Sequence, residues 1–190
     1  MDKIQKIRKS IGSIVSLTDN ELETFCRAFE PKKLKKNDYL LKEGQVCSFV
    51  GFINFGTLVY FKINENGDEL TTDFAFENEW VNNNQSRLSN TPSTINIRAI
   101  EDTELFVIKQ KDLIELYIQI PKIERLGRVL MEQAYLKIVD QTVEFQVLSA
   151  KERYEILLKK HPEIVQKVQL YHIANYLGIN PKSLSRIRKK

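Results

Sequence analysis

The hydrophobic and polar positions separate a first half with strand-like alternation from a second half with helical periodicity. The chain opens on a helical stretch, in which Thr18 suits the N-cap position of a helix over residues 21–29. From about Tyr39 the pattern changes to alternation, which is typical of strands that are half buried. The first half is therefore expected to be rich in β-structure.

Two hairpins are predicted within this alternating region. Residues 49–63 are rich in Val, Phe, Tyr and Ile with Gly56 as an interruption, and Asn66-Gly67 supplies left-handed conformations for a tight turn into a strand over 70–76. A second pair, residues 95–99 and 104–108, is joined by the polar segment Glu101-Asp102-Thr103. Short strands about ten residues apart, with no helix between them, favour an antiparallel sandwich or barrel.

Residues 77–94 interrupt this rhythm with a long, polar, Asn-rich segment. Long loops inside compact domains are often functional, so a ligand-recognition segment is one interpretation. The other is an irregular surface connection with Trp80 packed against the barrel. The sequence leaves both open.

A single long helix is predicted over residues 121–147, because Pro121 suits a first turn and neither Gly nor Pro follows Gly127. Its apolar residues form two stripes on nearly opposite sides. One consists of Ile123, Leu126, Leu130, Met131, Ala134, Ile138 and Phe145, and the other of Val129, Leu136, Val139, Val143 and Val147. A helix that is apolar on two sides needs a packing partner on each side. In a chain this short the second partner can be the same helix of another copy, which predicts a homodimer through this helix. Burial between two domains of one monomer is the alternative.

The last forty residues have the signals of a helix-turn-helix. A capping box at Ser149-Ala150-Lys151-Glu152 opens a helix to about Lys160, which His161-Pro162 ends. Two short helices with a steep crossing are then predicted from a buried face, a positive-φ break, an N-cap with proline after it, and a second buried face. These features are, in order, Ile173, Ala174 and Leu177; Gly178; Asn180 and Pro181; and Leu184 and Ile187.

The second of these helices presents polar and basic residues that the core leaves free. Such a face can enter a DNA major groove and reach the base edges. We expect Arg186 to contact a base, because its planar guanidinium group can donate two hydrogen bonds to one guanine. Lys182 and Lys189 carry point charges, which suit phosphates. Arg188 suits either target, and Gln169 and Tyr171 are placed to contact the backbone. The predicted DNA-binding residues are Gln169, Tyr171, Lys182, Ser183, Ser185, Arg186, Arg188 and Lys189.

Composition adds little beyond this placement of charge. The net charge of +4 is mild, but five of the last nine residues, Lys190 among them, are basic with no acid between them. No apolar run approaches the roughly 20 residues of a membrane span, and the N-terminus lacks the apolar centre of a secretory signal. We therefore expect a cytoplasmic protein without membrane contact.

The sequence gives no support for a metal site, a cofactor or an enzyme. Cys26 and Cys47 show no ligand spacing with His161 or His172, so zinc, an iron-sulfur cluster and haem are not indicated, and both thiols are expected to be reduced and structural. Neither histidine has a visible nucleophile or acid partner. Glu77 and Glu79 are interpreted as solvated surface charges.

The chain resembles the Crp/Fnr family of regulators over nearly its whole length. The resemblance rests on E-G-Q-V-C-S-F-V-G-F-I-N-F-G-T-L at residues 43–58, on Asn66-Gly67, on I-R-A-I-E-D-T-E-L at 97–105, on the long helix, and on I-A-N-Y-L-G-I-N-P-K-S-L-S-R-I-R-K-K at 173–190. It implies an α+β fold, in which an antiparallel β-roll (a double-stranded β-helix, jelly-roll-like) over 1–120 is followed by a dimerisation helix over 121–147 and a helix-turn-helix domain over 148–190.

The function implied is regulation of transcription by a homodimer bound to an inverted-repeat operator in double-stranded DNA, with Arg186 at the family's guanine-reading position. RNA polymerase is a further partner that the resemblance suggests. The sequence stops at Lys190, where many relatives continue into a β-hairpin wing, so fewer phosphate contacts are expected. The alternative function is an effector-binding or protein-interaction module with a vestigial DNA-binding region.

The effector segment departs from the family pattern. Nucleotide-binding members carry Gly-Glu near the start of a phosphate-binding cassette and Arg before Ser or Thr near its end, where this chain has Asn78-Glu79-Trp80 and Ser93-Thr94. A cyclic phosphate needs a cation or clustered N–H donors, and Arg87 is the remaining cation of this loop. The sequence thus predicts that cyclic AMP is not the effector, and that any small-molecule effector would meet Glu79, Trp80, Arg87, Ser93 and Thr94.

Overall fold

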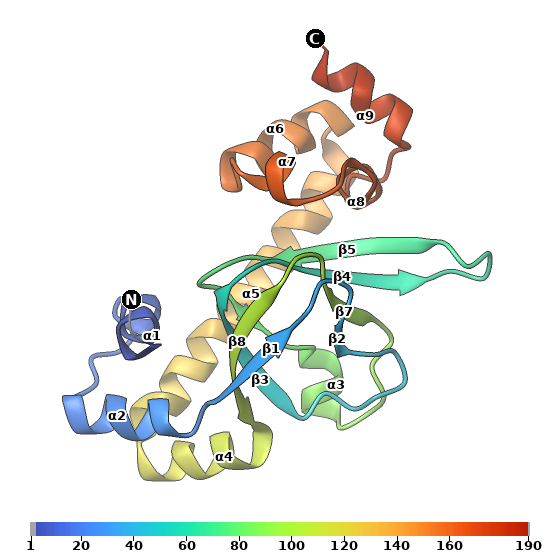
Figure 1. The fold of residues 1–190 in the computed structure, drawn as a ribbon. Helices are drawn as coiled ribbons and strands as arrows, with labels where there is room; N and C mark the ends of the chain where they lie inside the picture. The colour runs from blue at the N-terminus through green and yellow to red at the C-terminus, as the bar shows by residue number, and fades with distance from the viewer. Residues whose placement is uncertain (1–2, 190) are drawn as a thin grey trace. The chain divides into compact units, whose positions relative to one another are not determined.

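The computed structural model describes residues 3–189 (Figure 1). The chain folds into two compact units. The first contains the residues up to Tyr60 together with Phe74–Met131, and the second contains Phe61–Asp73 together with the residues from Glu132 onward. Among residues 3–189, no helix is both long enough and apolar enough to cross a membrane.

The β-structure consists of two four-stranded sheets, which lie in the first unit except for the parts of β4 and β5 within Phe61–Asp73. Their strand orders are β1-β8-β3-β6 and β2-β7-β4-β5, and the pairs β1–β8, β2–β7, β3–β6 and β3–β8 are antiparallel. The strands are β1 (Glu30–Leu34), β2 (Tyr39–Leu41), β3 (Phe49–Phe55), β4 (Leu58–Ile63), β5 (Glu69–Ala75), β6 (Trp80–Val81), β7 (Asn96–Ala99) and β8 (Thr103–Lys109). Buried side chains from both sheets form one core cluster, among them Leu41, Ile53, Leu58, Ile97 and Leu105. The expected antiparallel architecture is therefore confirmed.

The prediction of a hairpin over residues 95–108 is wrong. Its two strands, β7 and β8, belong to different sheets, because the chain crosses from one sheet to the other between them. The step from β3 to β4 makes the same crossing at Gly56, which has φ +99° and lies so close to Thr103 that a Cβ atom would come within 2.4 Å of its Oγ1. The Ile100 amide donates to the Thr57 carbonyl at 3.1 Å, so the two crossings support each other.

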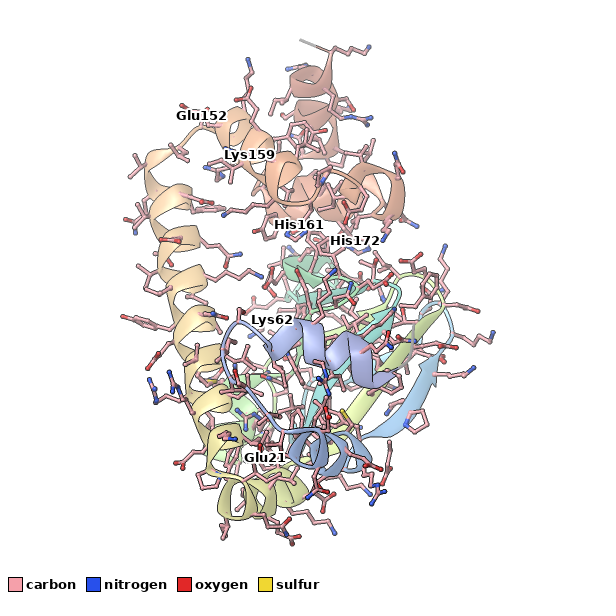
Figure 2. The ribbon with its side chains drawn as sticks, turned by 90° about the vertical axis from the view of Figure 1, so that its left-hand side faces the viewer. Glu21, Lys62, Glu152, Lys159, His161 and His172 are labelled. Atoms are coloured by element: carbon pink, nitrogen blue, oxygen red, sulfur yellow. The ribbon has the colours of Figure 1, made fainter. Side chains whose placement is uncertain are left out.

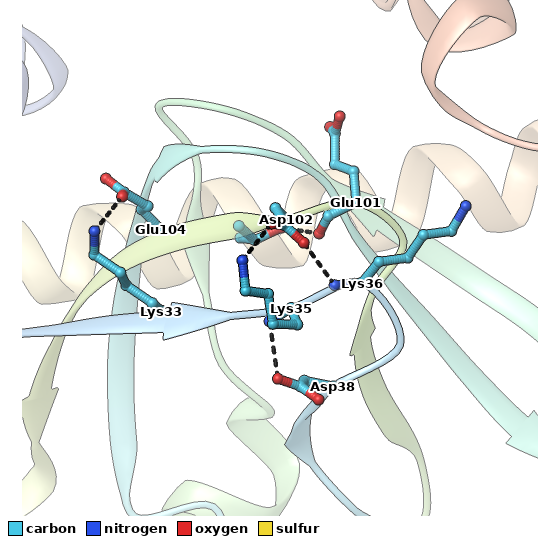
Figure 3. Close-up of polar contacts among 8 residues, drawn as sticks. Lys33, Lys35, Lys36, Asp38, Glu101, Asp102 and Glu104 are labelled. Atoms are coloured by element: carbon cyan, nitrogen blue, oxygen red, sulfur yellow. Dashed lines mark hydrogen bonds and ion pairs between the residues drawn. The ribbon is translucent and has the colours of Figure 1, made fainter.

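Strand β1 precedes the predicted start of the β-region at Tyr39, so that boundary is also wrong. Its sequence, Glu-Pro-Lys-Lys-Leu, buries only Leu34 and so shows no alternation. It is an edge strand of its sheet, a position that tolerates proline and favours lysine. Lysines and acids of β1, β8 and the adjoining turns pair across this edge (Figure 3). The hydrogen bond from Lys35 to Asp102, 2.8 Å long, lowers the pKa of that carboxyl.

Helices α1 (Lys3–Ile11), α2 (Asp19–Arg27), α4 (Gln110–Gln119) and the start of α5 (Pro121–Val147) pack against β3 and β8. Their buried residues include Ile7, Phe25, Leu113 and Leu126. Thr18 is the N-cap of α2, as predicted, and it also forms a capping box with Glu21. The helix spans Asp19–Arg27, two residues earlier than the predicted 21–29. The polar segment 77–94 contains β6 and the short helix α3 (Asn84–Ser89).

The second unit combines the tip of the β4–β5 hairpin with the end of α5 and four further helices. These are α6 (Ala150–Lys160), α7 (Ile164–Lys167), α8 (Leu170–Tyr176) and α9 (Pro181–Arg188), of which the sequence analysis did not predict α7. The bounds of α5 and the Ser149 capping box agree with the prediction.

At the hairpin turn the prediction needs a correction. Gly67 has φ +86° but Asn66 does not adopt a positive φ, because the turn spans more than two residues. The side chain of Asn64 holds it by accepting from the amides of Asn66 and Asp68 at 2.9 and 2.8 Å.

Candidate nucleic-acid interface

Helices α8 and α9 and the turn between them form the structure expected of a DNA reader. Gly178 has φ +69° in the turn, and Asn180 caps α9 by accepting from the Ser183 amide at 2.8 Å. Pro181 occupies the first turn of α9. The core between the helices is formed by Ile173, Ala174, Leu177 and Leu184, each at most 1% exposed.

Arg153 of α6 fixes this turn from the other side, and sequence reasoning did not identify it. Its guanidinium donates to the Leu177 carbonyl at the end of α8 at 2.8 Å and to the Leu148 carbonyl after α5 at 2.5 Å. It also lies 4.5 Å from the centre of the Phe145 ring, which in turn covers Gly178. Carbonyls at helix ends attract cations, so Arg153 holds the ends of two helices together.

The exposed face of α9 is basic. Lys182, Ser185, Arg186, Arg188 and Lys189 are exposed, with Leu184 buried on the opposite side of the helix. Ser183 is partly buried, and the Ser185 hydroxyl donates to the Pro181 carbonyl at 3.0 Å, so these two serines are less available than the cations. Lys190 lies outside the described residues.

The residues predicted at the start of α8 differ in their surroundings. Gln169 is the exposed N-cap residue of α8. The Tyr171 hydroxyl donates to the Glu69 carbonyl of the β4–β5 hairpin at 3.0 Å, a contact that the sequence did not suggest. Its neighbour His172 is buried, and its Nδ1 shares a 3.0 Å hydrogen bond with the Thr71 hydroxyl of the same hairpin.

Of the predicted effector residues, Ser93 and Arg87 lie in a network that uses their polar atoms internally. Asn83 donates to the Ser93 hydroxyl at 2.7 Å, which donates to the Ile95 carbonyl at 2.7 Å. The Arg87 guanidinium donates to the side chains of Gln110 and Asn84 at 2.7 and 3.0 Å, although its buried Nε has no partner.

The other effector residues lie apart from this network. Trp80 packs against Phe52 with ring centres 5.1 Å apart, and its indole N–H donates to the Ser10 hydroxyl at 3.1 Å. For Trp80 the structure thus supports the interpretation as a side chain packed against the barrel. The Glu79 carboxylate accepts from the Phe76 amide at 3.0 Å, and Thr94 is exposed. Within residues 3–189, no three His, Cys, Asp or Glu side chains gather so as to hold a metal ion.

Comparison with known proteins connects both parts of the chain to one group. Residues 31–119 match the cyclic nucleotide-binding domain family. The transcriptional activator protein Anr of Pseudomonas protegens is 25% identical over an alignment of 167 residues, with coverage of 82% of this chain and 68% of Anr. FixK2 from Bradyrhizobium japonicum has a similar structure, with a TM-score of 0.74, 15% identity, and coverage of 85% of this chain and 83% of FixK2. A Crp/Fnr-family regulator from Eubacterium rectale gives a TM-score of 0.68 at 17% identity, over 91% and 82% of the two chains.

A β-roll of the cyclic-nucleotide-binding type, followed in the same chain by a long helix and a helix-turn-helix, defines a class of one-chain transcription regulators. In sequence and structure the chain is similar to regulators of the Crp/Fnr family within that class. The fold and the resemblance to this family that the sequence indicated are thereby confirmed.

Proposed function

We propose that this regulator binds DNA sequence-specifically through α9, with Arg186 as the base-reading residue. The observation that carries the proposal is the arrangement of α9, where exposed cations face outward and Leu184 is fully buried behind them. An Arg side chain in a major groove can donate two hydrogen bonds to one guanine, and each such pair discriminates against other bases by about 1–3 kcal/mol. Lys182 and Lys189 would bind phosphates, which strengthens binding to any sequence.

Enrichment of bound sequences from a random duplex pool tests this assignment without a known operator. The wild-type protein should enrich an inverted repeat, and Arg186→Ala and Arg186→Lys should lose the preference at one position in each half-site. Lys159→Ala, which removes an exposed cation from α6, is the matched control and should enrich the wild-type sequence. No enrichment by the wild type would favour the alternative of a vestigial reader, and an unchanged preference in Arg186→Ala would show that another residue reads the base.

We also propose a homodimer through α5. In the second unit, one side of this helix contacts the reader, since Gln141 donates to the Tyr176 hydroxyl at 3.0 Å and Phe145, although 55% exposed, lies over Gly178. The apolar stripe on the other side is exposed, with Leu136 at 58%, Val143 at 54% and Val147 at 73%. A stripe of this kind with a period of three to four residues suits a parallel helix pair related by two-fold symmetry.

Sedimentation equilibrium of Val143→Asp tests the dimer. An aspartate in the centre of the stripe should shift the protein to monomers, because it would bury two carboxylates at a two-fold interface. Thr142→Asp adds the same charge at the next, exposed position and should remain dimeric. Equal masses for the two variants would contradict an interface along this stripe.

An effector other than cyclic AMP is the third part of the proposal. The segment that would bind a cyclic phosphate uses most of its side-chain donors internally, as the Asn83–Ser93 and Arg87–Gln110 hydrogen bonds illustrate, with the Arg87 Nε as the exception among those described. A ligand that binds the folded state raises its melting temperature. We expect cyclic AMP to give no such shift, and a clear shift by cyclic AMP would overturn this part. As a regulator on DNA, the protein would act in the cytoplasm, and RNA polymerase would be its further partner.

A further inference from the structure

The β4–β5 hairpin carries an unusual attachment to the reader. In its sheet β5 is the last strand in the order, so its outer backbone groups face away from β4. Asn175 of α8 pairs with that outer edge through both ends of its side-chain amide. Its Nδ2 donates to the Glu69 carbonyl at 2.6 Å, and its Oδ1 accepts from the Thr71 amide at 3.1 Å. A single side chain thus takes the place of a neighbouring strand, which also donates to one residue and accepts from a residue two positions away.

Alternate residues of β5 extend this attachment. Thr71 is buried and shares its hydroxyl hydrogen bond with His172, which Figure 2 shows on the reader. Asp73 forms a 2.7 Å ion pair with Lys137 of α5. Because successive side chains of a strand point to opposite faces, residues 69, 71 and 73 form one face, and Thr72 and Leu70 point away and are exposed. The contact is therefore built from a complete strand face.

The docked hairpin occupies groups that a DNA backbone would need. The Tyr171 hydroxyl, a proposed phosphate contact, donates its hydrogen bond to the Glu69 carbonyl instead. The hairpin tip contains three acidic residues, Glu65, Asp68 and Glu69, and one lysine, Lys62. It therefore has a net negative charge, and it lies in the same unit as the reader. Carboxylates beside a DNA-binding face repel phosphates and compete with them for the same cations.

We propose that the β4–β5 hairpin is an intramolecular inhibitor of DNA binding, docked on α8 through Asn175 and Thr71. This inference rests on the proposed DNA-binding function. DNA and hairpin compete for the same edge of α8, so the protein binds a duplex after the hairpin has left. Any change that weakens the docking raises the fraction of free reader and hence the apparent affinity.

Binding of a fluorescent random-sequence duplex by the full chain tests the inhibition. Thr71→Val removes the hydroxyl that meets His172 while keeping the shape and the backbone amide. It should bind the duplex about fivefold more tightly than wild type, which corresponds to the roughly 1 kcal/mol of one hydrogen bond. Thr72→Val makes the same substitution one residue along, on the exposed face, and should bind as the wild type does. Asn175→Ala removes the clamp from the reader side and should also tighten binding, with circular dichroism as the check on folding.

Hydrogen exchange at the Thr71 amide gives a second measurement. This amide donates to Asn175 in the free protein and should lose protection when the duplex is bound. Unchanged protection in the complex, or equal affinities for Thr71→Val and Thr72→Val, would overturn the inhibition and leave the DNA-binding function standing. If neither the wild type nor the released variants bind any duplex, the DNA-binding function falls and the inhibition falls with it.

Discussion

Gly178→Ala should destabilise the reader more than Gly67→Ala does, for two separable reasons. Gly178 has φ +69°, a conformation that residues with a Cβ atom adopt at a cost of roughly 1 kcal/mol. The added Cβ would also lie 2.7 Å from Cζ and 3.2 Å from Cε2 of the Phe145 ring. That ring is held in place by the Arg153 guanidinium, so it cannot move without losing a second contact.

The magnitude follows from adding the two costs. The Phe145 ring is 55% exposed and can turn aside, so the overlap costs at most its contact with Arg153, about 0.5–1 kcal/mol, and Gly178→Ala should lose about 1.5–2 kcal/mol in total. Gly67→Ala isolates the first cost, because Gly67 has φ +86° and a Cβ atom there would meet nothing within 4 Å. We expect about 1 kcal/mol for this control. On a Phe145→Ala background, Gly178→Ala should cost no more than Gly67→Ala.

Urea unfolding followed by circular dichroism measures these free energies, and duplex binding reports whether α9 is still held correctly. Gly178→Ala should weaken duplex binding as well, since the turn sets the direction of α9, whereas Gly67→Ala should not weaken it. If Gly178→Ala and Gly67→Ala lowered the free energy of unfolding by the same amount, the Phe145 ring would not be fixed over the turn. The account of how α5 and α6 support the reader would then be refuted.

Three further outcomes are expected. Arg153→Met, which removes charged hydrogen bonds to two helix-end carbonyls, should cost roughly 2–4 kcal/mol in urea unfolding and weaken duplex binding. Burial lowers the pKa of the His161 imidazole below its ordinary 6.5. The free energy of unfolding should therefore be highest above pH 6.5 and should fall as the pH drops through the folded-state pKa, because the unfolded chain then binds the proton more readily. Thermal unfolding in a pH series should show this fall, and His161→Gln should lack it. A double-mutant cycle of Asp73→Asn and Lys137→Gln in urea unfolding should show a coupling of about 0.5 kcal/mol, because the two side chains form an ion pair 2.7 Å long.

Local signals allowed much of the fold to be predicted. The bounds of α5, the caps at Thr18, Ser149 and Asn180, and the left-handed Gly178 all depend on residues within one or two turns of one another. Such features are visible in a sequence, because propensity and capping act over short distances. This explains why the reader was predicted in more detail than the β-roll.

The errors involve choices between distant partners. Alternation showed that β7 and β8 are strands, but it could not show that they join different sheets, since the same apolar faces suit a hairpin or a crossing. Asn175 and Thr71 are 104 residues apart, and their pairing uses a backbone edge that has no side-chain signature. Arg153 gave no signal either, because a helix-end carbonyl is an acceptor in any sequence.

The arrangement of elements gives the reader two connections to the β-roll. The helix α5 begins in the first unit and ends in the second, and strands β4 and β5 are each shared between the units, because the second unit takes only Phe61–Asp73 from them. Within the second unit, both the end of α5 and the β4–β5 hairpin contact α8, where Gln141 meets Tyr176 and Glu69 meets Asn175. A signal that shifted β4 and β5 would therefore reach the reader even with α5 unchanged. DNA binding can then be controlled in two ways, through the dimer helix α5 and through the β4–β5 hairpin. Both elements act on the same helix of the reader, α8.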